Sequence, residues 1–166
     1  YASIKEAIDK NGWPTLGEAR GKAIFIMLDH EDNREAYTYG LTTLTGRVIF
    51  SDGPVDSDFG IFNRHDDPIA DREDILEEVK NGIMIRTRAD SRSEEAINED
   101  YTRFEAALEV GAHFISTDFP APDTGKELET PYYIEIPEGT PSRCNPLTAP
   151  DECTSEALEN LDTEKL

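Results

Sequence analysis

Short apolar runs alternate along the chain with segments that have the apolar spacing of helices. The first run, KAIFIMLD at residues 22–29, is continuous, and shorter runs follow at 47–52, 60–66, 83–90 and 113–119. A continuous run of this length predicts a strand that is covered on both faces. Between the runs, residues 71–82 place Ile75, Leu76 and Val79 on one side of a predicted helix, which Asn81-Gly82 ends. This alternation predicts parallel βα units.

Other helices are indicated by capping pairs and apolar stripes. Ser3 and Glu6 form a potential capping box for a helix over residues 3–12, and Ser91 and Glu94 form another. A helical stripe follows the second pair and ends at Gly111; it consists of Tyr101, Phe104, Ala107 and Leu108. A weaker pattern predicts a helix over residues 34–39.

Polar residues collect where the predicted strands end. In GIMIRTRAD, residues 82–90, an apolar strand finishes with Arg86, Arg88 and Asp90 at alternate positions, which places all three on one face. Other predicted strands end similarly, in Asp29, Asn63, Arg64, Ser116 and Asp118. Parallel α/β folds bind ligands at the carboxyl ends of their strands, so we expect a site there.

The composition changes after Pro120. Residues 121–166 are rich in proline, with a predicted strand at 132–136 and a short terminal helix at 154–161. We therefore divide the chain into a regular part, 1–120, and a carboxyl-terminal cap, 121–166. Cys144 and Cys153 lie close together in the cap, which favours a local disulfide and an oxidising compartment, although two buried free thiols would give the same sequence.

The charge of the chain restricts its partners. The formal net charge is −20, from 36 acidic and 16 basic residues. Such a surface repels phosphate backbones, so we expect no nucleic acid partner, and the acidity itself is explained by solubility or a salty habitat. No apolar run is long enough for a transmembrane segment. A basic pocket would stand out against this background.

Three segments carry a family resemblance: residues 13–29, 82–120 and 139–153. In this order and spacing they resemble the calcium-dependent phosphoinositide-specific phospholipase C proteins of bacteria and fungi, within a wider group of barrel phosphodiesterases. The resemblance implies a TIM-type (β/α)₈ barrel. The roughly five βα strands here would form its carboxyl-terminal portion. They would make an open arc of parallel strands, followed by a Pro-rich, disulfide-tied cap. The absent strands would carry the catalytic histidines and the calcium ligands.

The resemblance also implies an activity. It indicates an extracellular or secreted phosphoric diester hydrolase that acts on phosphoinositides with calcium. The catalytic residues are unknown in this chain. The chain by itself is therefore expected to be inactive. Arg86, Arg88, Asp90 and Asp118 would bind the phosphodiester substrate, since arginine matches phosphate oxygens and vicinal hydroxyls and a neighbouring carboxylate orients it. An Arg–Asp network that only plugs the barrel end is the competing interpretation.

Other polar residues are weaker candidates for a catalytic or metal-binding role. His30 and His65 follow strands but do not match the family's catalytic pair, and His113 is expected to be structural. The stretch that starts at Asp29 is no EF-hand, because Arg34 stands where the loop needs glycine and Gly40 where it needs glutamate, although Asp29 or Glu31 could still contact a cation. The acidic helix face within residues 71–78 is expected to be solvated.

A second function remains open for the whole chain. It could be a complete, non-catalytic α/β domain with a flavodoxin-like sheet, whose strand-end arginines bind a small anionic ligand.

Overall fold

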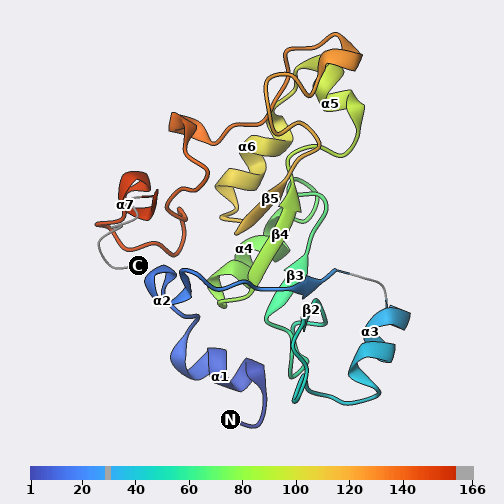
Figure 1. The fold of residues 1–166 in the computed structure, drawn as a ribbon, viewed down its shortest axis with the longest axis vertical. Coiled ribbons are helices and arrows are strands. Elements are labelled where there is room, and N and C mark those ends of the chain that lie inside the picture. The colour runs from blue at the N-terminus through green and yellow to red at the C-terminus, as the bar shows by residue number, and fades with distance from the viewer. Residues whose placement is uncertain (29–30, 160–166) are drawn as a thin grey trace.

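The computed structural model describes residues 1–28 and 31–159. Five short strands form two parallel sheets (Figure 1). β1 (Ile26–Met27) pairs with β2 (Phe50–Ser51). The second sheet has the order β3-β4-β5 and consists of Phe62–Arg64, Met84–Arg88 and Phe114–Ser116. Each strand lies inside a predicted apolar run, and the predicted α/β class with parallel strands is confirmed.

The helices also follow the predicted pattern. The α-helices are α1 (Ile4–Asn11), α2 (Leu16–Ala19), α3 (Glu31–Thr38), α4 (Arg72–Lys80), α5 (Ser93–Asn98), α6 (Thr102–Glu109) and α7 (Ser155–Glu159), and the 3₁₀ turns are η1 (Lys126–Leu128) and η2 (Pro137–Gly139). Ser3 caps α1, since its hydroxyl accepts a hydrogen bond from the Glu6 N–H. The predicted terminal helix is present as far as Glu159; residues 160–166, with its predicted last residues, lie outside the described part.

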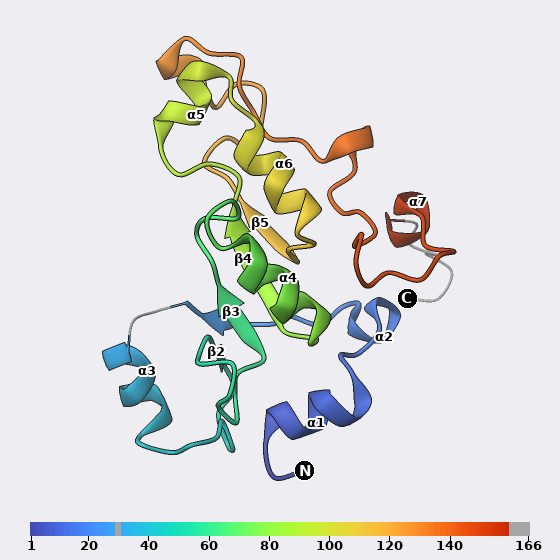
Figure 2. The same ribbon diagram turned by 180° about the vertical axis from the view of Figure 1, so that it is seen from behind.

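The main core lies between the three-stranded sheet and its helices. Ile75 and Val79 from α4 pack with Ile85 of β4 and with Val110, which follows α6. Figure 2 shows α4 and α6 in front of β4 and β5, so both helices cover the same face of the sheet. Burial of these aliphatic side chains is what fixes the helices on that face.

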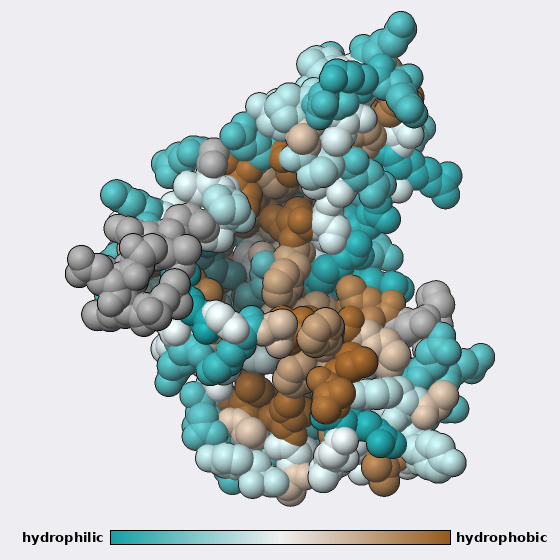
Figure 3. Space-filling view, viewed as in Figure 1, coloured by the Kyte–Doolittle hydropathy of each residue, from teal (hydrophilic) through white to brown (hydrophobic). Residues whose placement is uncertain are grey.

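Strand alternation then determines what the opposite face carries. Ile85 and Thr87 are fully buried, whereas Met84, Arg86 and Arg88 are partly exposed. Because successive side chains point to opposite faces of a strand, the two arginines lie on the face away from α4 and α6. On the side seen in Figure 1, apolar residues gather in a band through the middle of the molecule, bordered by hydrophilic residues (Figure 3).

The first predicted strand is much less buried than its composition indicated. Only Ile26 and Met27 belong to β1, and Ile24 and Phe25 are 42% and 66% exposed. The prediction that both faces of this strand are covered is therefore wrong. A ladder of two residues is too short to hold a neighbouring layer against either face.

The strands do not form one continuous sheet in the described residues. Between β2 and β3, residues 54–60 fold on themselves, with hydrogen bonds from Ser57 N to Pro54 O and from Gly60 N to Ser57 O. A side chain at Gly60 would clash with Pro54 O, since its Cβ would lie 2.2 Å away. These two hydrogen bonds lie within the loop, the Asp58 oxygen accepts from the Lys5 N–H, and β2 and β3 belong to different sheets. The described strands close no barrel, and the expected barrel arc stays a proposal.

The segment after β4 contains two helices. α5 and α6 are separated by Glu99, whose φ of 52° is left-handed. The residue that reaches back to the start of α5 is Glu95, one position after the predicted Glu94, and its carboxylate accepts from the Ser91 hydroxyl at 2.9 Å. Of the predicted stripe, Phe104 and Ala107 are buried and Leu108 is half-buried, whereas Tyr101 precedes α6 and is exposed.

The carboxyl-terminal segment packs along α5 and β5 without adding a strand. Residues 132–136 were predicted to be a strand, but they form none. One backbone hydrogen bond, from Ile134 N to Phe119 O, joins them to the segment that follows β5. Tyr132 is fully buried against Phe119 and Tyr101. The predicted Cys144–Cys153 disulfide is present. The boundary between 1–120 and 121–166 stays a prediction.

Candidate functional site

Arginines from adjacent strands meet at the carboxyl end of the three-stranded sheet. Arg64 of β3 and Arg86 of β4 are partners in the parallel register, and Arg88 is the partner of Ser116 on β5. Neighbouring strands lie about 4.8 Å apart, so residues in register on one face are side by side. The sheet therefore presents a row of guanidinium groups on the face that α4 and α6 leave uncovered.

Arg86 is held from both sides. Its Nε donates to Ser116 Oγ at 2.9 Å, and its Nη1 donates to Asp66 Oδ1 at 2.6 Å. The arginine side chain is 18% exposed, whereas Asp66 is 57% exposed. The guanidinium is thus oriented by an interior hydroxyl and by a carboxylate that faces solvent.

Arg88 is fixed at the very end of β4. Its Nε donates to the backbone oxygen of Asp90 at 2.8 Å, and its Nη2 donates to Asp118 Oδ2 at 3.0 Å. The predicted neighbourhood of Arg88 and Asp118 is therefore present in the structure. Asp118 is 65% exposed, so this part of the site is open to a ligand.

Asp90 lies behind the arginines. Its side chain is completely buried, its Oδ2 accepts from the Thr117 hydroxyl at 2.5 Å, and its Oδ1 accepts from the Asp118 N–H at 3.1 Å. Its Oδ1 also lies 3.7 Å from Arg88 Nη2. A buried carboxylate with these partners joins the ends of β4 and β5. It is placed to position Arg88 and Asp118, and a ligand on the open face does not reach it.

Arg64, Asp66 and Arg103 belong to the site although the sequence analysis did not select them as binding residues. Arg64 Nε lies 3.7 Å from Asp66 Oδ2, and Arg103 of α6 donates from Nη1 to the backbone oxygen of Asp66 at 3.2 Å. Arg64 was recognisable only as a strand-end residue. Its role depends on the register between β3 and β4, which the sequence does not state.

Arg103 anchors the loop that follows β3. It forms ion pairs with Asp67 and with Glu95, both at 3.1 Å. Burial opposes ionisation of Asp67, but hydrogen bonds from the Ala70 and Ile69 N–H groups and the charge of Arg103 outweigh it, so the pKa of Asp67 lies below its usual value. The loop backbone is therefore held firmly beside the arginine row.

Two histidines form structural contacts. His65 lies between two carboxylates of the α4 region, with Nε2 at 3.1 Å from Glu78 and Nδ1 at 3.3 Å from Asp71. His113 Nδ1 accepts from the Ile85 N–H at 3.0 Å, a contact that agrees with a structural role, and partial desolvation of its ring lowers its pKa. His30 and Asp29 lie outside the described residues, as does the side chain of Glu31.

The described residues do not fit a calcium ion. Ca²⁺ requires several oxygen ligands in one place, and residues 1–28 and 31–159 hold no group of three or more acidic, histidine or cysteine side chains in such an arrangement. The carboxylates nearest the arginine row, Asp66 and Asp118, are each paired with a guanidinium. We therefore assign no calcium ligand in this part of the chain.

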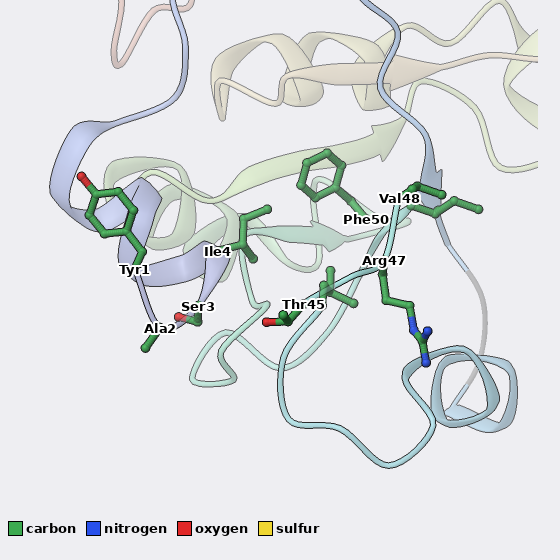
Figure 4. Close-up of a pocket in the computed structure, with 10 residues that line it drawn as sticks. Tyr1, Ala2, Ser3, Ile4, Thr45, Arg47, Val48 and Phe50 are labelled. Atoms are coloured by element: carbon green, nitrogen blue, oxygen red, sulfur yellow. The ribbon is translucent and has the colours of Figure 1, made fainter.

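A cavity of about 200 Å³ lies away from the arginine row, between the start of α1 and residues 44–50. Figure 4 shows Ile4 and Phe50 facing it, while Arg47 extends away from it. The Arg47 guanidinium instead lies 5.6 Å from the centre of the Tyr37 ring. This cavity lacks the convergent charged groups of the strand-end site and is not a second candidate of equal weight.

The fold and the arginine row together define a parallel α/β protein with an arginine-lined edge at the ends of its strands. The family model described as phosphoinositide phospholipase C, Ca²⁺-dependent, matches residues 1–146, and the chain belongs to this family. No curated protein and no solved structure matches the chain. In the described residues, no helix is both long enough and apolar enough to cross a bilayer.

Proposed function

We propose that the chain contributes the substrate-orienting wall of a phospholipase C that hydrolyses the phosphodiester bond of phosphoinositides. The observation that supports this most directly is the partly exposed guanidinium row formed by Arg64, Arg86 and Arg88 in a chain with a net charge of −20. A phosphoinositide offers phosphate oxygens and ring hydroxyls, which are suitable acceptors for arginine donors. Membership of the family supports a lipid substrate.

Arg88 has the central place in this proposal. Its Nη2 is at the solvent-facing edge, beside the exposed Asp118, while its Nε is fixed on the backbone of Asp90. A guanidinium that is already oriented loses less conformational freedom when it binds phosphate. Asp90 acts behind it as a positioning residue, and Asp118 can accept a hydrogen bond from a ring hydroxyl.

We also propose an extracellular or secreted location, supported by the Cys144–Cys153 disulfide, since disulfides persist mainly in oxidising compartments. Calcium dependence is a property of the family by its description. Because the described residues do not fit the ion, we assign no reaction step to it here.

The decisive experiment compares Arg88→Ala with Arg88→Lys and with a control, Arg72→Ala. Arg72 is another arginine in an ion pair, 3.0 Å from Glu109, but it belongs to α4 on the covered side of the sheet. Binding to phosphatidylcholine vesicles that contain phosphatidylinositol is measured for each variant of this chain. Release of inositol phosphate is measured for the same variants in a longer protein that includes the strands with the catalytic histidines. We expect Arg88→Ala to lose about tenfold or more in binding or rate, Arg88→Lys to recover part of it, and Arg72→Ala to resemble the wild type. Equal values for Arg88→Ala and the wild type would remove the assignment.

The alternative is a non-catalytic domain that binds a small anion through the same arginines. One observation favours it, namely that His65 and His113, the described histidines, are both occupied by structural contacts. The two functions are distinguished by turnover. Vesicle binding that depends on Arg88, with no release of inositol phosphate even by the longer protein, supports the binding domain.

A further inference from the structure

The carboxylate of Asp66 bridges the two arginines that are in register. Its Oδ1 accepts from Arg86 Nη1 at 2.6 Å, and its Oδ2 lies 3.7 Å from Arg64 Nε. Each oxygen therefore faces a different guanidinium. Two oxygens of a tetrahedral phosphate group would be bound by two adjacent arginines in the same way.

The bridge is needed because the arginines are neighbours. Arg64 and Arg86 are register partners on adjacent parallel strands, and their guanidinium groups repel each other unless an anion lies between them. Asp66 provides that anion from within the chain. The pair is thus an oxyanion site whose occupant, in this structure, is a side chain of the protein.

The surroundings of Asp66 allow the side chain to leave while the loop stays in place. The Asp66 backbone oxygen accepts from Arg103 Nη1, and the next residue, Asp67, accepts from the Ile69 and Ala70 N–H groups. The Asp66 side chain is 57% exposed, so it can turn toward solvent. Exposed ion pairs of this kind are individually weak.

Arg86 keeps its position when Asp66 leaves. Its Nε donates to Ser116 Oγ on β5, and its side chain is only 18% exposed. Arg64 starts from the register position beside Arg86 on β3. The two arginines therefore stay on adjacent strands, and their guanidinium groups become available to another anion when the carboxylate rotates away.

We propose that Asp66 is a displaceable internal competitor that occupies an Arg64–Arg86 phosphate site and lowers its affinity for phosphate groups. A phosphate group carries more charge than a carboxylate and more acceptor oxygens, so it can displace Asp66 where a weaker anion cannot. The shared ligand chemistry is a phosphate monoester, whether on a lipid headgroup or free in solution. The inference rests on the proposed function in one respect only: the proposed function identifies the molecule that carries the phosphate in nature.

The test titrates the full chain with inorganic phosphate by isothermal titration calorimetry. We expect Asp66→Asn to bind phosphate roughly fivefold more tightly than the wild type, because a negative charge about 4 Å from the bound anion is removed. Asp66→Ser, which removes the charge without adding an amide, should give the same gain. Adding Arg64→Gln to Asp66→Asn should abolish it.

The matched control is Glu109→Gln, which removes one negative charge from another exposed arginine pair. Glu109 is 63% exposed and lies 3.0 Å from Arg72, in the helix layer. An equal gain in Glu109→Gln and Asp66→Asn would mean that net charge alone controls phosphate binding, and the proposal would be overturned. Unchanged or weaker binding in both Asp66 variants would also overturn it, because Asp66 would then be a permanent clamp.

Vesicle binding separates the sources of phosphate and separates this inference from the proposed function. Phosphatidylcholine vesicles that contain phosphatidylinositol 4-phosphate are compared with vesicles that contain phosphatidylinositol. A gain in Asp66→Asn only for the former assigns the site to a lipid headgroup, and a gain only with inorganic phosphate assigns it to a free anion. If Arg88→Ala weakens phosphoinositide binding while the Asp66 variants change nothing, this inference fails and the proposed function stands. If phosphate binding responds to Asp66 but the chain binds no phosphoinositide, this inference stands and the proposed function fails.

Discussion

The buried carboxylate of Asp90 accepts a hydrogen bond from the backbone N–H of Asp118 at 3.1 Å. This contact joins the end of β4 to the residues that follow β5, and the Thr117 hydroxyl donates to the same carboxylate. Asp118 in turn pairs with Arg88 on the open face. The exposed part of the site is thus placed by a carboxylate that solvent does not reach.

The first prediction is that Asp90→Asn destabilises the protein by about 2–3 kcal/mol. An amide has one acceptor oxygen, so its NH₂ group must face either the Thr117 hydroxyl or the Asp118 N–H, which are both donors in the native arrangement. Chemical unfolding measures the loss. Asp118→Asn is the control: it alters only an exposed pair, and we expect a change of about 1 kcal/mol or less. Equal losses in the two variants would show that Asp90 has no special structural role.

The alternation of residues in β4 correctly predicted the face on which the arginines lie, but it did not predict that Asp90 is buried. Because Ile83 and Ile85 had to be buried, Arg86 and Arg88 had to lie on the opposite face, and they do. Asp90 follows the same alternation in the sequence but lies beyond the last residue of β4, where the chain leaves the strand and turns its carboxylate inward. The alternation of side chains between the two faces holds only for residues that are paired within the strand.

Long-range relationships were the part that the sequence did not specify. The partnership of Arg64 with Arg86 depends on strand register, and β2 and β3 belong to different sheets. Neither follows from local pattern. In contrast, the Cys144–Cys153 disulfide was predictable, because the two cysteines are close in the chain.

The second prediction concerns Thr87, whose side chain is fully buried in the core beneath α4 and α6. Its hydroxyl oxygen has no hydrogen-bond partner within the described residues. Thr87→Val keeps the branched shape and removes the unsatisfied hydroxyl, so we expect unchanged stability or a gain of up to about 1 kcal/mol in thermal unfolding. Thr117→Val provides the contrast. Its hydroxyl donates to Asp90 and accepts from the Phe119 N–H, and its loss should cost about 1–3 kcal/mol. A clear loss of stability in Thr87→Val would reveal a partner for its hydroxyl.

The third prediction is a loss of stability in mild acid that depends on His113. His113 is exposed as a whole residue, but partial desolvation of its ring lowers the pKa of His113 below its ordinary value of 6.5, and its neutral Nδ1 accepts from the Ile85 N–H. In the unfolded chain the imidazole binds a proton near the ordinary value, whereas in the folded chain it stays neutral to lower pH. The contribution of His113 to stability is therefore complete above pH 6.5 and declines as the pH falls from there toward the folded pKa.

Unfolding free energies measured between about pH 5 and 7 check this dependence. His113→Asn is the informative variant, since an asparagine oxygen can accept from the Ile85 N–H but does not titrate. We expect its stability to fall less with acid over this range than that of the wild type. Parallel curves for the two proteins would mean that His113 takes up its proton equally in both states.

The last prediction concerns the Cys144–Cys153 disulfide, which closes a loop with a sequence separation of 9. Loop closure of this size corresponds to about 2–3 kcal/mol of stabilisation through the unfolded chain. Beside the bridge, Asn145 Nδ2 donates to the backbone oxygen of Gly111, which connects this loop to the end of α6. Replacing both cysteines by alanine should therefore increase hydrogen exchange in residues 130–153 and near Gly111, while the core strand β4 stays protected. Asn145→Ala in the oxidised protein should increase exchange near Gly111 alone. Unchanged exchange after loss of the disulfide would show that packing of Tyr132 and Phe119 holds the segment without it.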